Sequence, residues 1–295
     1  MAEGKIIKAL SGFYYVLDGE RIVQCRGRGV FRFEKKKASP LVGDFVEYQA
    51  ENDQEGYILA IKERKNELVR PPIANVDQAI LVFSAVRPDF NPGLLDRFLV
   101  LIEAKRIDPI ICLTKMDLLS QEEASSLERY VEDYRSFGYT VLLTSSLKKE
   151  GLEEFSQYMN GKTSVFAGQS GVGKSSLLNA LRPELELKTN DISNSLGRGK
   201  HTTRHVELIH VNEGLIADTP GFSSLEFTEI EAEELPYCFP EMVERSHECK
   251  FRGCLHVNEP KCAVKKAVEA EEIPSYRYEH YLQFMEEIKD RKPRY

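Results

Sequence analysis

The sequence predicts a multi-domain protein with an N-terminal all-β barrel, a central α/β domain built on a mostly parallel sheet, and a small C-terminal helical domain with a metal site. Three observations support this fold class. Residues 1–70 hold short β-branched and aromatic runs, residues 73–229 alternate apolar strands with amphipathic helices, and residues 230–295 contain four cysteines. Short strands without helices favour a small closed barrel, whereas alternating strands and helices favour a parallel sheet covered on both faces.

The overall composition is that of a water-soluble globular protein. The chain has 295 residues, of which 42% are hydrophobic and 29% are charged, as expected for two or three packed domains. No stretch reaches the roughly 18 apolar residues of a membrane span, and Met1–Leu10 lacks the apolar centre of a signal peptide. We therefore expect a cytoplasmic protein with no membrane partner. The net charge of −7 argues weakly against nucleic acid, although local patches decide that question.

The first domain, residues 1–70, is expected to be a five-stranded barrel of the OB type. Glycines and polar residues separate runs such as Tyr14–Leu17, Arg21–Cys25 and Tyr57–Ile61. A basic segment with interleaved aromatic rings lies among these strands: Arg26, Arg28, Phe31, Arg32, Phe33, Lys35, Lys36 and Lys37. Such a segment suits a phosphate backbone and stacked bases, so it is a candidate RNA contact. A solvated charged loop is the alternative interpretation.

The central domain follows Lys62–Pro72, a polar segment ending in two prolines that is expected to be a linker. Buried strands are expected at Ala79–Phe83, Pro109–Leu113, Thr140–Leu143 and Thr163–Ala167, and helices at Gly93–Ala104 and Gln121–Phe137. Because strands and helices alternate, a parallel sheet with helices on both faces is expected over residues 73–229.

A phosphate-binding loop follows the last of these strands. The pattern G-x-x-x-x-G-K-[ST] is fitted at every position by Gly168, Gln169, Ser170, Gly171, Val172, Gly173, Lys174 and Ser175. Glycines let backbone N–H groups point at a phosphate, and the helix that begins at Ser175 favours an anion at its N-terminus. Lys174 is expected to reach the β- and γ-phosphates, Ser175 to bind Mg²⁺, and Ser176 to join the nucleotide contacts. An ordinary glycine-rich turn is the alternative.

The tetrapeptide Thr114-Lys115-Met116-Asp117 is expected to select guanine. It follows a parallel strand, where such sheets bind ligands, and the Asp117 carboxylate can accept hydrogen bonds from guanine N1–H and its exocyclic amine. The Lys115 stem can cover the purine face. Thr114 stands where asparagine is more common, so the amide that would brace the loop is missing. After the next strand, Thr144-Ser145-Ser146 resembles a loop that contacts the guanine oxygen through a backbone N–H.

Two further segments are expected to sense the γ-phosphate. Asp218-Thr219-Pro220-Gly221 fits D-x-x-G, in which Asp218 binds Mg²⁺ through water and the Gly221 N–H meets the γ-phosphate; a plain turn is the alternative. The long segment Pro183–Arg204 is a candidate switch loop.

Within that loop, Thr202 or Thr203 would complete the Mg²⁺ shell, and the first of the two is preferred. Phe222 follows Gly221 at the position of a water-orienting glutamine, and a phenyl ring cannot polarise water. We therefore expect that His201 orients or deprotonates the water, or that hydrolysis awaits a partner; a surface histidine near the phosphates is the alternative.

The order of the motifs is permuted. The guanine-selecting residues precede the phosphate loop, whereas ordinary GTPases have the reverse order. Catalysis requires only that these loops meet at one edge of the sheet, so the permutation is compatible with activity. It also means that the D-x-x-G motif leads within a few residues into the C-terminal domain, residues 230–295.

A metal site is expected in the C-terminal domain. Cys249, Cys254, His256 and Cys262 form C-x4-C-x-H-x5-C, and three thiolates with one imidazole can enclose a structural Zn²⁺. In a cytosolic chain this use of cysteine is more common than disulfides. Cys238 and His247 are alternative ligands, and unrelated buried cysteines are the alternative to a site.

Together the permuted order, the barrel and the cysteine-histidine site resemble one family, the bacterial ribosome small-subunit-dependent GTPase A (RsgA, also called YjeQ or YloQ). The resemblance covers nearly the whole chain and rests on G-Q-S-G-V-G-K-S, T-K-M-D, G-R-G-K-H-T-T and D-T-P-G-F. It implies an OB-fold, a permuted GTPase domain that uses GTP/GDP and Mg²⁺, and a domain with one structural Zn²⁺. Phe222 and His201 also belong to the family pattern.

The resemblance further implies that the protein binds the small (30S) ribosomal subunit late in its maturation, and that the subunit stimulates hydrolysis of GTP to GDP and phosphate. The basic barrel segment then becomes an rRNA contact with strong salt dependence. A monomer is expected for a factor that docks on a large particle. Two rivals are a small-molecule kinase, for which no acceptor pocket is evident, and an RNA-binding module with a degenerate nucleotide site, against which Lys174, Ser175 and Asp218 argue.

Overall fold

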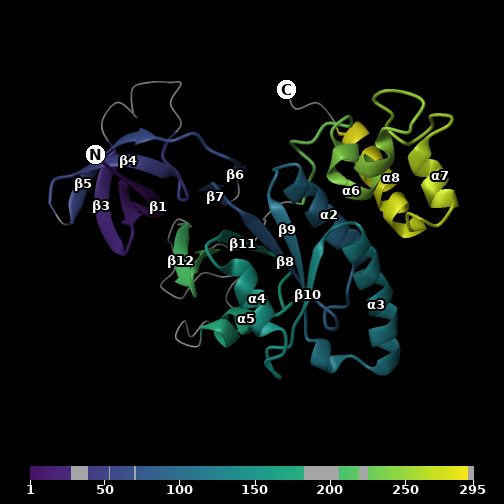
Figure 1. Cartoon of the computed structure of the whole chain (residues 1–295), viewed down its shortest axis with the longest axis horizontal. Coiled ribbons are helices and arrows are strands. Elements are labelled where there is room, and N and C mark those ends of the chain that lie inside the picture. Colours follow the sequence, from purple (N-terminus) through teal and green to yellow (C-terminus); the bar gives the residue numbers. More distant parts are fainter. Residues whose placement is uncertain (28–38, 53, 70, 183–205, 219–224, 292–295) are drawn as a thin grey trace.

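The structure is a computed structural model that describes residues 1–27, 39–52, 54–69, 71–182, 206–218 and 225–291. The expected three-part architecture is confirmed. The β-barrel and the helical C-terminal unit lie on opposite sides of the central α/β domain (Figure 1). In the described part of the chain, no helix combines the length and apolar character that crossing a membrane requires.

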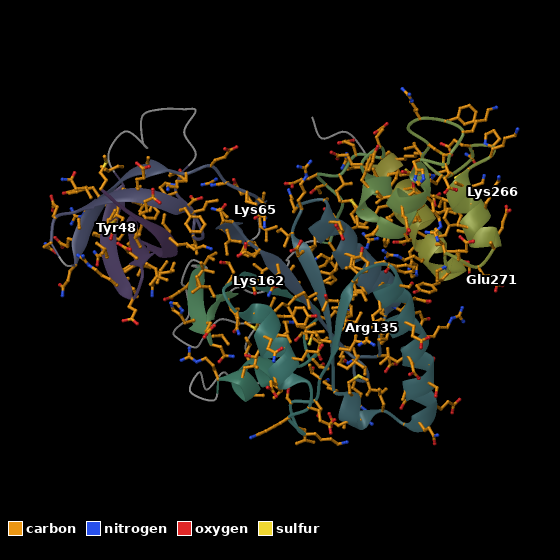
Figure 2. The ribbon with its side chains drawn as sticks, viewed as in Figure 1. Tyr48, Lys65, Arg135, Lys162, Lys266 and Glu271 are labelled. Carbon is orange, nitrogen blue, oxygen red and sulfur yellow. The ribbon has the colours of Figure 1, made fainter. Side chains whose placement is uncertain are left out.

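The N-terminal barrel is built, among the described residues, from β1 (Ala2–Leu10), β2 (Phe13–Asp18), β3 (Arg21–Gly27), β4 (Phe45–Ala50) and β5 (Glu55–Ile61). The strands run in the order β1-β2-β3-β5-β4, and β4 returns to β1 to close the barrel; β3 and β5 are parallel. Alternate side chains fill the interior, including Tyr48, which points into the barrel and donates a hydrogen bond to Asp18 Oδ2 at 2.8 Å (Figure 2).

The segment expected to be a linker is structured. It contains β6 (Glu67–Val69), which pairs with β7 (Pro72–Ala74) at the end of the segment, and its Lys65 lies between the barrel and the α/β domain (Figure 2). Arg64 donates two hydrogen bonds, of 2.7 and 2.8 Å, to the carboxylate of the buried Asp44. Gly43 has φ +91°, and a Cβ there would lie 1.9 Å from the Ala74 carbonyl oxygen, so a glycine is required for this close approach. The segment therefore fastens the two domains together.

The central sheet contains β8 (Gln78–Ser84), β9 (Asp108–Thr114), β10 (Thr140–Leu143), β11 (Thr163–Ala167), β12 (Glu207–Val211) and β13 (Gly214–Asp218). Their order is β10-β9-β8-β11-β13-β12, and all are parallel except β12, which is antiparallel to β13. At its free edge β12 pairs with β1, where Lys8 and Glu207 also form an ion pair of 2.9 Å. The sheet thus continues into the barrel.

Helices cover both faces of the sheet, as expected for buried parallel strands. On one side α2 (Pro92–Glu103) and α3 (Gln121–Ser136) pack over Leu81 and Phe83 of β8. On the other side α4 (Leu152–Met159) and α5 (Lys174–Leu181) pack over Ile80 and Val82. Alternation along β8 therefore supplies two separate cores.

The C-terminal unit holds the short 3-10 helix η3 (Leu235–Cys238) and the helices α6 (Pro240–Ser246), α7 (Ala263–Glu269) and α8 (Ser275–Lys289). Its core includes Phe239, Tyr281 and Phe284, and Val100 of α2 belongs to the same cluster. Because α2 contributes to the sheet core with one face and to this core with another, it joins the α/β domain to the C-terminal unit.

Candidate functional site

The phosphate loop connects β11 to α5 and needs its glycines. Gly168 has φ +142°, and a Cβ there would lie 2.1 Å from the carbonyl oxygen of Val82 on β8. Gly173 has φ +98° and precedes the first residue of α5, Lys174. Both conformations are ones that side-chain-bearing residues rarely adopt. The predicted strand–loop–helix context of the motif is therefore present.

Lys174 lies inside this loop. Its side chain is buried, and Nζ donates hydrogen bonds to the carbonyl oxygens of Gly168 at 2.7 Å and Gln169 at 2.6 Å. Burial lowers the pKa of the ammonium group to about 8 because the charged form loses solvation. Among the side chains that the structure describes, no carboxylate pairs with Nζ. Ser175, also buried, is the next residue of α5. A buried cation beside a helix N-terminus is suited to a polyphosphate.

The base-selecting loop is attached directly to the phosphate loop. Thr114 ends β9, and its hydroxyl donates a hydrogen bond to the carbonyl oxygen of Val172. Lys115 Nζ donates to the carbonyl oxygen of Gly171 at 2.7 Å and to that of Arg87. The expectation that this loop lacks a brace because asparagine is absent is therefore corrected: the threonine hydroxyl supplies it. No local sequence signal reports a contact that spans 58 residues.

Asp117 is held in place by Ser145. The Ser145 hydroxyl donates a hydrogen bond of 2.6 Å to Asp117 Oδ1, and Ser145 itself is fully buried. The Ser145 backbone N–H donates to the carbonyl oxygen of Glu150 at 3.0 Å, which turns the loop after β10 back on itself. The neighbouring Ser146 is half-buried. Ser145 therefore supports the aspartate rather than offering its own N–H to a ligand.

These loops meet at one edge of the sheet. Thr114, Ser145 and Gly168 each lie at or just beyond the carboxyl end of β9, β10 or β11, which are parallel. Asp218 ends β13, a parallel neighbour of β11, at the same edge. Several other predicted residues lie outside the described residues: His201, Thr202, Thr203, Gly221, Phe222, Arg28, Phe31, Arg32, Phe33, Lys35, Lys36 and Lys37. Of the basic segment, Arg26 is described and lies over the Phe13 ring at 4.9 Å.

The predicted metal ligands converge in the C-terminal unit. One ligand atom from each of Cys249, Cys254, His256 and Cys262 lies within 4.8 Å of the other three. Cys249 Sγ is 3.9 Å from Cys262 Sγ and 3.7 Å from His256 Nδ1, which is itself 3.3 Å from Cys262 Sγ. A tetrahedral zinc site with sulfur ligands has edges of about 3.8 Å. The donor set and its spacing therefore fit a zinc ion.

Surrounding groups hold these ligands in position. The backbone N–H groups of Ala263 and Lys265 donate to Cys249 Sγ at 3.3 Å and Cys262 Sγ at 3.5 Å, which favours thiolates. The Tyr278 hydroxyl donates to the carbonyl oxygen of His256 at 2.6 Å. The two alternative ligands lie outside the cluster: Cys238 is buried among apolar side chains, and the side chain of His247 is 74% exposed.

Comparison with protein families gives two matches that together span most of the chain. Residues 61–228 match the RsgA GTPase family, and residues 3–58 match the RsgA N-terminal domain. Two relatives called "Small ribosomal subunit biogenesis GTPase RsgA" align over the full length of both chains. The protein from Geobacillus sp. (strain WCH70) is 68% identical, and that from Bacillus subtilis (strain 168) is 67% identical.

Two solved structures resemble the whole chain. YloQ, described as a circularly permuted GTPase, superposes with a TM-score of 0.87 and 62% identity, covering 100% of this chain and 97% of that one. YjeQ from Thermotoga maritima also gives a TM-score of 0.87, with 38% identity and 99% coverage of both chains. The similarity therefore includes the permuted strand order as well as the flanking domains.

Proposed function

The chain belongs to the RsgA GTPase family, and from this premise we propose that it hydrolyses GTP while bound to the small ribosomal subunit during the biogenesis of that subunit. The names of its relatives support the role in small-subunit biogenesis. One structural observation supports the nucleotide assignment most strongly. Thr114 and Lys115 bind the phosphate loop directly, so the guanine-selecting loop and the phosphate cradle form a single unit.

In this proposal the phosphates lie in the cradle of residues 168–175. The backbone N–H groups of the loop and the Lys174 ammonium bind the β- and γ-phosphates, and Ser176 of α5 joins the nucleotide contacts. Ser175, Thr202 and a water held by Asp218 would coordinate Mg²⁺, and Thr203 is the alternative to Thr202. Mg²⁺, when bound, neutralises charge that develops as the terminal phosphoryl group is transferred.

The base is selected by Asp117. Its carboxylate accepts hydrogen bonds from guanine N1–H and the exocyclic amine, and Ser145 fixes its orientation. The Lys115 stem covers the purine face. Because the Ser145 N–H already donates to the carbonyl oxygen of Glu150, the N–H of Ser146 makes the contact to the guanine oxygen.

Hydrolysis requires that a water oxygen attacks the γ-phosphorus while the bond to the β–γ bridging oxygen breaks. The Gly221 N–H holds the γ-phosphate. Phe222 cannot polarise the water, so His201 orients it or accepts its proton. Stimulation by the small subunit then consists of placing His201 beside the water. A His201→Ala variant whose subunit-stimulated turnover equals that of the wild type would remove His201 from the mechanism.

The flanking domains bind the subunit. The OB-type barrel contacts rRNA through its basic segment. The C-terminal unit also contacts rRNA, and it is stabilised by a Zn²⁺ bound to Cys249, Cys254, His256 and Cys262. The protein acts in the cytoplasm as a monomer. If these contacts are made to phosphates, the affinity for the subunit should fall steeply as the salt concentration rises from about 50 to 200 mM.

The decisive experiment measures GTP and ATP hydrolysis with and without purified small subunits. We expect GTP-selective turnover that rises when subunits are added. Equal rates with and without subunits would refute the small subunit as the stimulating partner.

An Asp117→Asn variant tests the nucleotide assignment. Its amide offers a donor where guanine also offers one, so GTP affinity should fall roughly 100-fold and xanthosine triphosphate should bind better. Asp108→Asn, at the opposite end of β9, is the matched control.

A further inference from the structure

The chain that leaves the D-x-x-G motif is held between two domains. We call residues 225–231 the connector. Leu225 packs against the core of the α/β domain, whereas Phe227, two residues later, is buried in the core of the C-terminal unit. The connector therefore crosses from one core to the other at Leu225 to Phe227. Figure 1 shows α8 beside α2 at this boundary.

Arg97 of α2 stands at the crossing point. Its Nη1 donates a hydrogen bond of 3.0 Å to the carbonyl oxygen of Leu225. The same guanidinium makes two hydrogen bonds, of 2.9 and 2.5 Å, to the carboxylate of Glu287 on α8. Its Cζ atom lies over two neighbouring rings, 4.6 Å from the centroid of Phe227 and 4.9 Å from that of Phe284. One side chain thus joins the α/β domain, the connector and the C-terminal unit.

The contact is specific to arginine. A planar guanidinium can form a forked pair with a carboxylate, keep a further N–H for a carbonyl, and stack on aromatic rings at the same time. A lysine at this position would retain the charge but would lose the fork and the stacking. The Arg97 side chain is 23% exposed, so this pair is partly shielded from solvent, unlike an ordinary surface ion pair.

We propose that Arg97 is a positioning residue for GTP hydrolysis, because the Arg97–Glu287 pair fixes the chain at Leu225, four residues after the γ-phosphate-sensing Gly221. This inference rests on the proposed GTPase function. Four residues reach at most roughly 14 Å, so an anchor at Leu225 limits the positions open to the Gly221 N–H. Anchoring one end of the segment in advance lowers the entropy lost when the N–H meets the γ-phosphate.

A second contact anchors the far end of the connector. Arg291, just beyond α8, donates hydrogen bonds to the carbonyl oxygens of Phe227 at 2.6 Å and Ile230 at 3.2 Å, and pairs with Glu231 at 2.8 Å. The C-terminal unit therefore holds the connector at both ends, through Glu287 by way of Arg97 and through Arg291. A partner that shifts α8 would move the anchor that follows the D-x-x-G motif. The C-terminal unit would thereby control the rate of GTP hydrolysis.

The test compares the affinities for GDP and for a non-hydrolysable GTP analogue. The variants are Arg97→Ala, Arg97→Lys and Glu287→Gln. The γ-phosphate discrimination, defined as the ratio of the two dissociation constants, should shift at least fivefold against the GTP analogue in Arg97→Ala, whereas GDP affinity should stay within twofold. Subunit-stimulated kcat should fall at least tenfold. Arg97→Lys should retain part of the discrimination, and Glu287→Gln should lie between Arg97→Lys and the wild type.

The matched control is Glu272→Gln, which removes a comparable carboxylate from the C-terminal unit, where it pairs with Arg245 at 3.4 Å and does not contact the connector. It should leave discrimination and kcat unchanged. If wild-type protein shows no GTP hydrolysis, the proposed function fails. If wild-type protein is active and Arg97→Ala keeps its discrimination and kcat, or if Glu272→Gln loses as much as Glu287→Gln, the role of Arg97 is overturned.

Discussion

The guanidinium of Arg277 on α8 forms an ion pair with the carboxylate of Asp96 on α2, and neither side chain is exposed to solvent. Its Nε donates a hydrogen bond of 2.7 Å to Glu241 Oε1 on α6, and the guanidinium lies over the Phe239 ring, 4.5 Å from the centroid. His280 Nδ1 lies 2.6 Å from the second oxygen of Asp96. A buried network of charges thus lies at the boundary between the α/β domain and the C-terminal unit.

Removing the cation from this network should be costly. In Arg277→Met, Asp96 and Glu241 remain buried without their main counter-charge, which typically destabilises a protein by about 3–5 kcal/mol. Urea unfolding followed by circular dichroism would measure the loss. Arg245→Met, a change at a partly exposed arginine on α6, should cost less than about 1 kcal/mol. A similar cost for both variants would show that the buried network contributes no special stability.

This network illustrates what the sequence could not predict. Motifs whose residues are close along the chain, such as Gly168–Ser175 and Cys249–Cys262, were predicted because their chemistry is local. Arg97 reaches Leu225 across 128 residues, and Thr114 reaches Val172 across 58. In sequence, Arg277 resembles any charged residue on a helix surface. Its burial depends on where α2 packs, and no spacing rule reports that.

Strand and linker predictions were limited for a related reason. The strand β1 was not predicted, because its lysines interrupt the apolar pattern and only its middle, including Ile6, is fully buried. Lys62–Pro72 was interpreted as a linker from its polarity. Its polar side chains instead hold the domain junction, because Asn66 donates a hydrogen bond to the carbonyl oxygen of Val76 and Arg64 donates to Asp44. Polarity signals exposure only when no partner lies nearby.

The hydroxyl of Thr114 should matter for nucleotide binding. Thr114→Val keeps the shape of the side chain but leaves the Val172 carbonyl oxygen without its donor, which costs about 1–1.5 kcal/mol, or roughly a tenfold loss of affinity for GDP and GTP alike. Thr114→Asn should retain most of the affinity because its amide can donate to the same carbonyl. Titration with a fluorescent nucleotide would measure both. If Thr114→Val and the wild type had equal nucleotide affinities, the hydrogen bond from Thr114 to Val172 would not contribute to nucleotide binding.

Metal removal should unfold the C-terminal unit before the rest of the protein. We expect one zinc per chain in protein purified without chelator, and Cys254→Ser should lose it, because a hydroxyl is a poor zinc ligand. Limited proteolysis should then cut within residues 230–291, while the phosphate loop still binds GDP. Cys238→Ser is the matched control, since this cysteine is buried in the same core but lies outside the cluster. Its zinc content should equal that of the wild type.

Glu103 should give stability a pH dependence. Burial raises the pKa of this carboxyl group to about 6, although Tyr139 and Arg277 oppose the shift. The folded state therefore binds the proton more tightly than the unfolded chain, in which the pKa is near 4.5. This contribution is fully present below about pH 4.5 and is lost as the pH rises through about 6. At neutral pH the charged carboxylate weakens the fold.

Glu103→Gln should consequently stabilise the protein at pH 7.5 by about 1 kcal/mol, a value that allows for the partial exposure of the side chain. The advantage should shrink as the pH falls from about 6 to 4.5, because the wild-type carboxyl then becomes neutral too. Urea unfolding at several pH values would measure the difference between the two proteins. Glu269→Gln, at an exposed position on α7, should show no such trend. If the difference in unfolding free energy between Glu103→Gln and the wild type stayed constant across this pH range, the pKa of Glu103 would not be raised. Only a group that titrates between these pH values can make that difference change with pH.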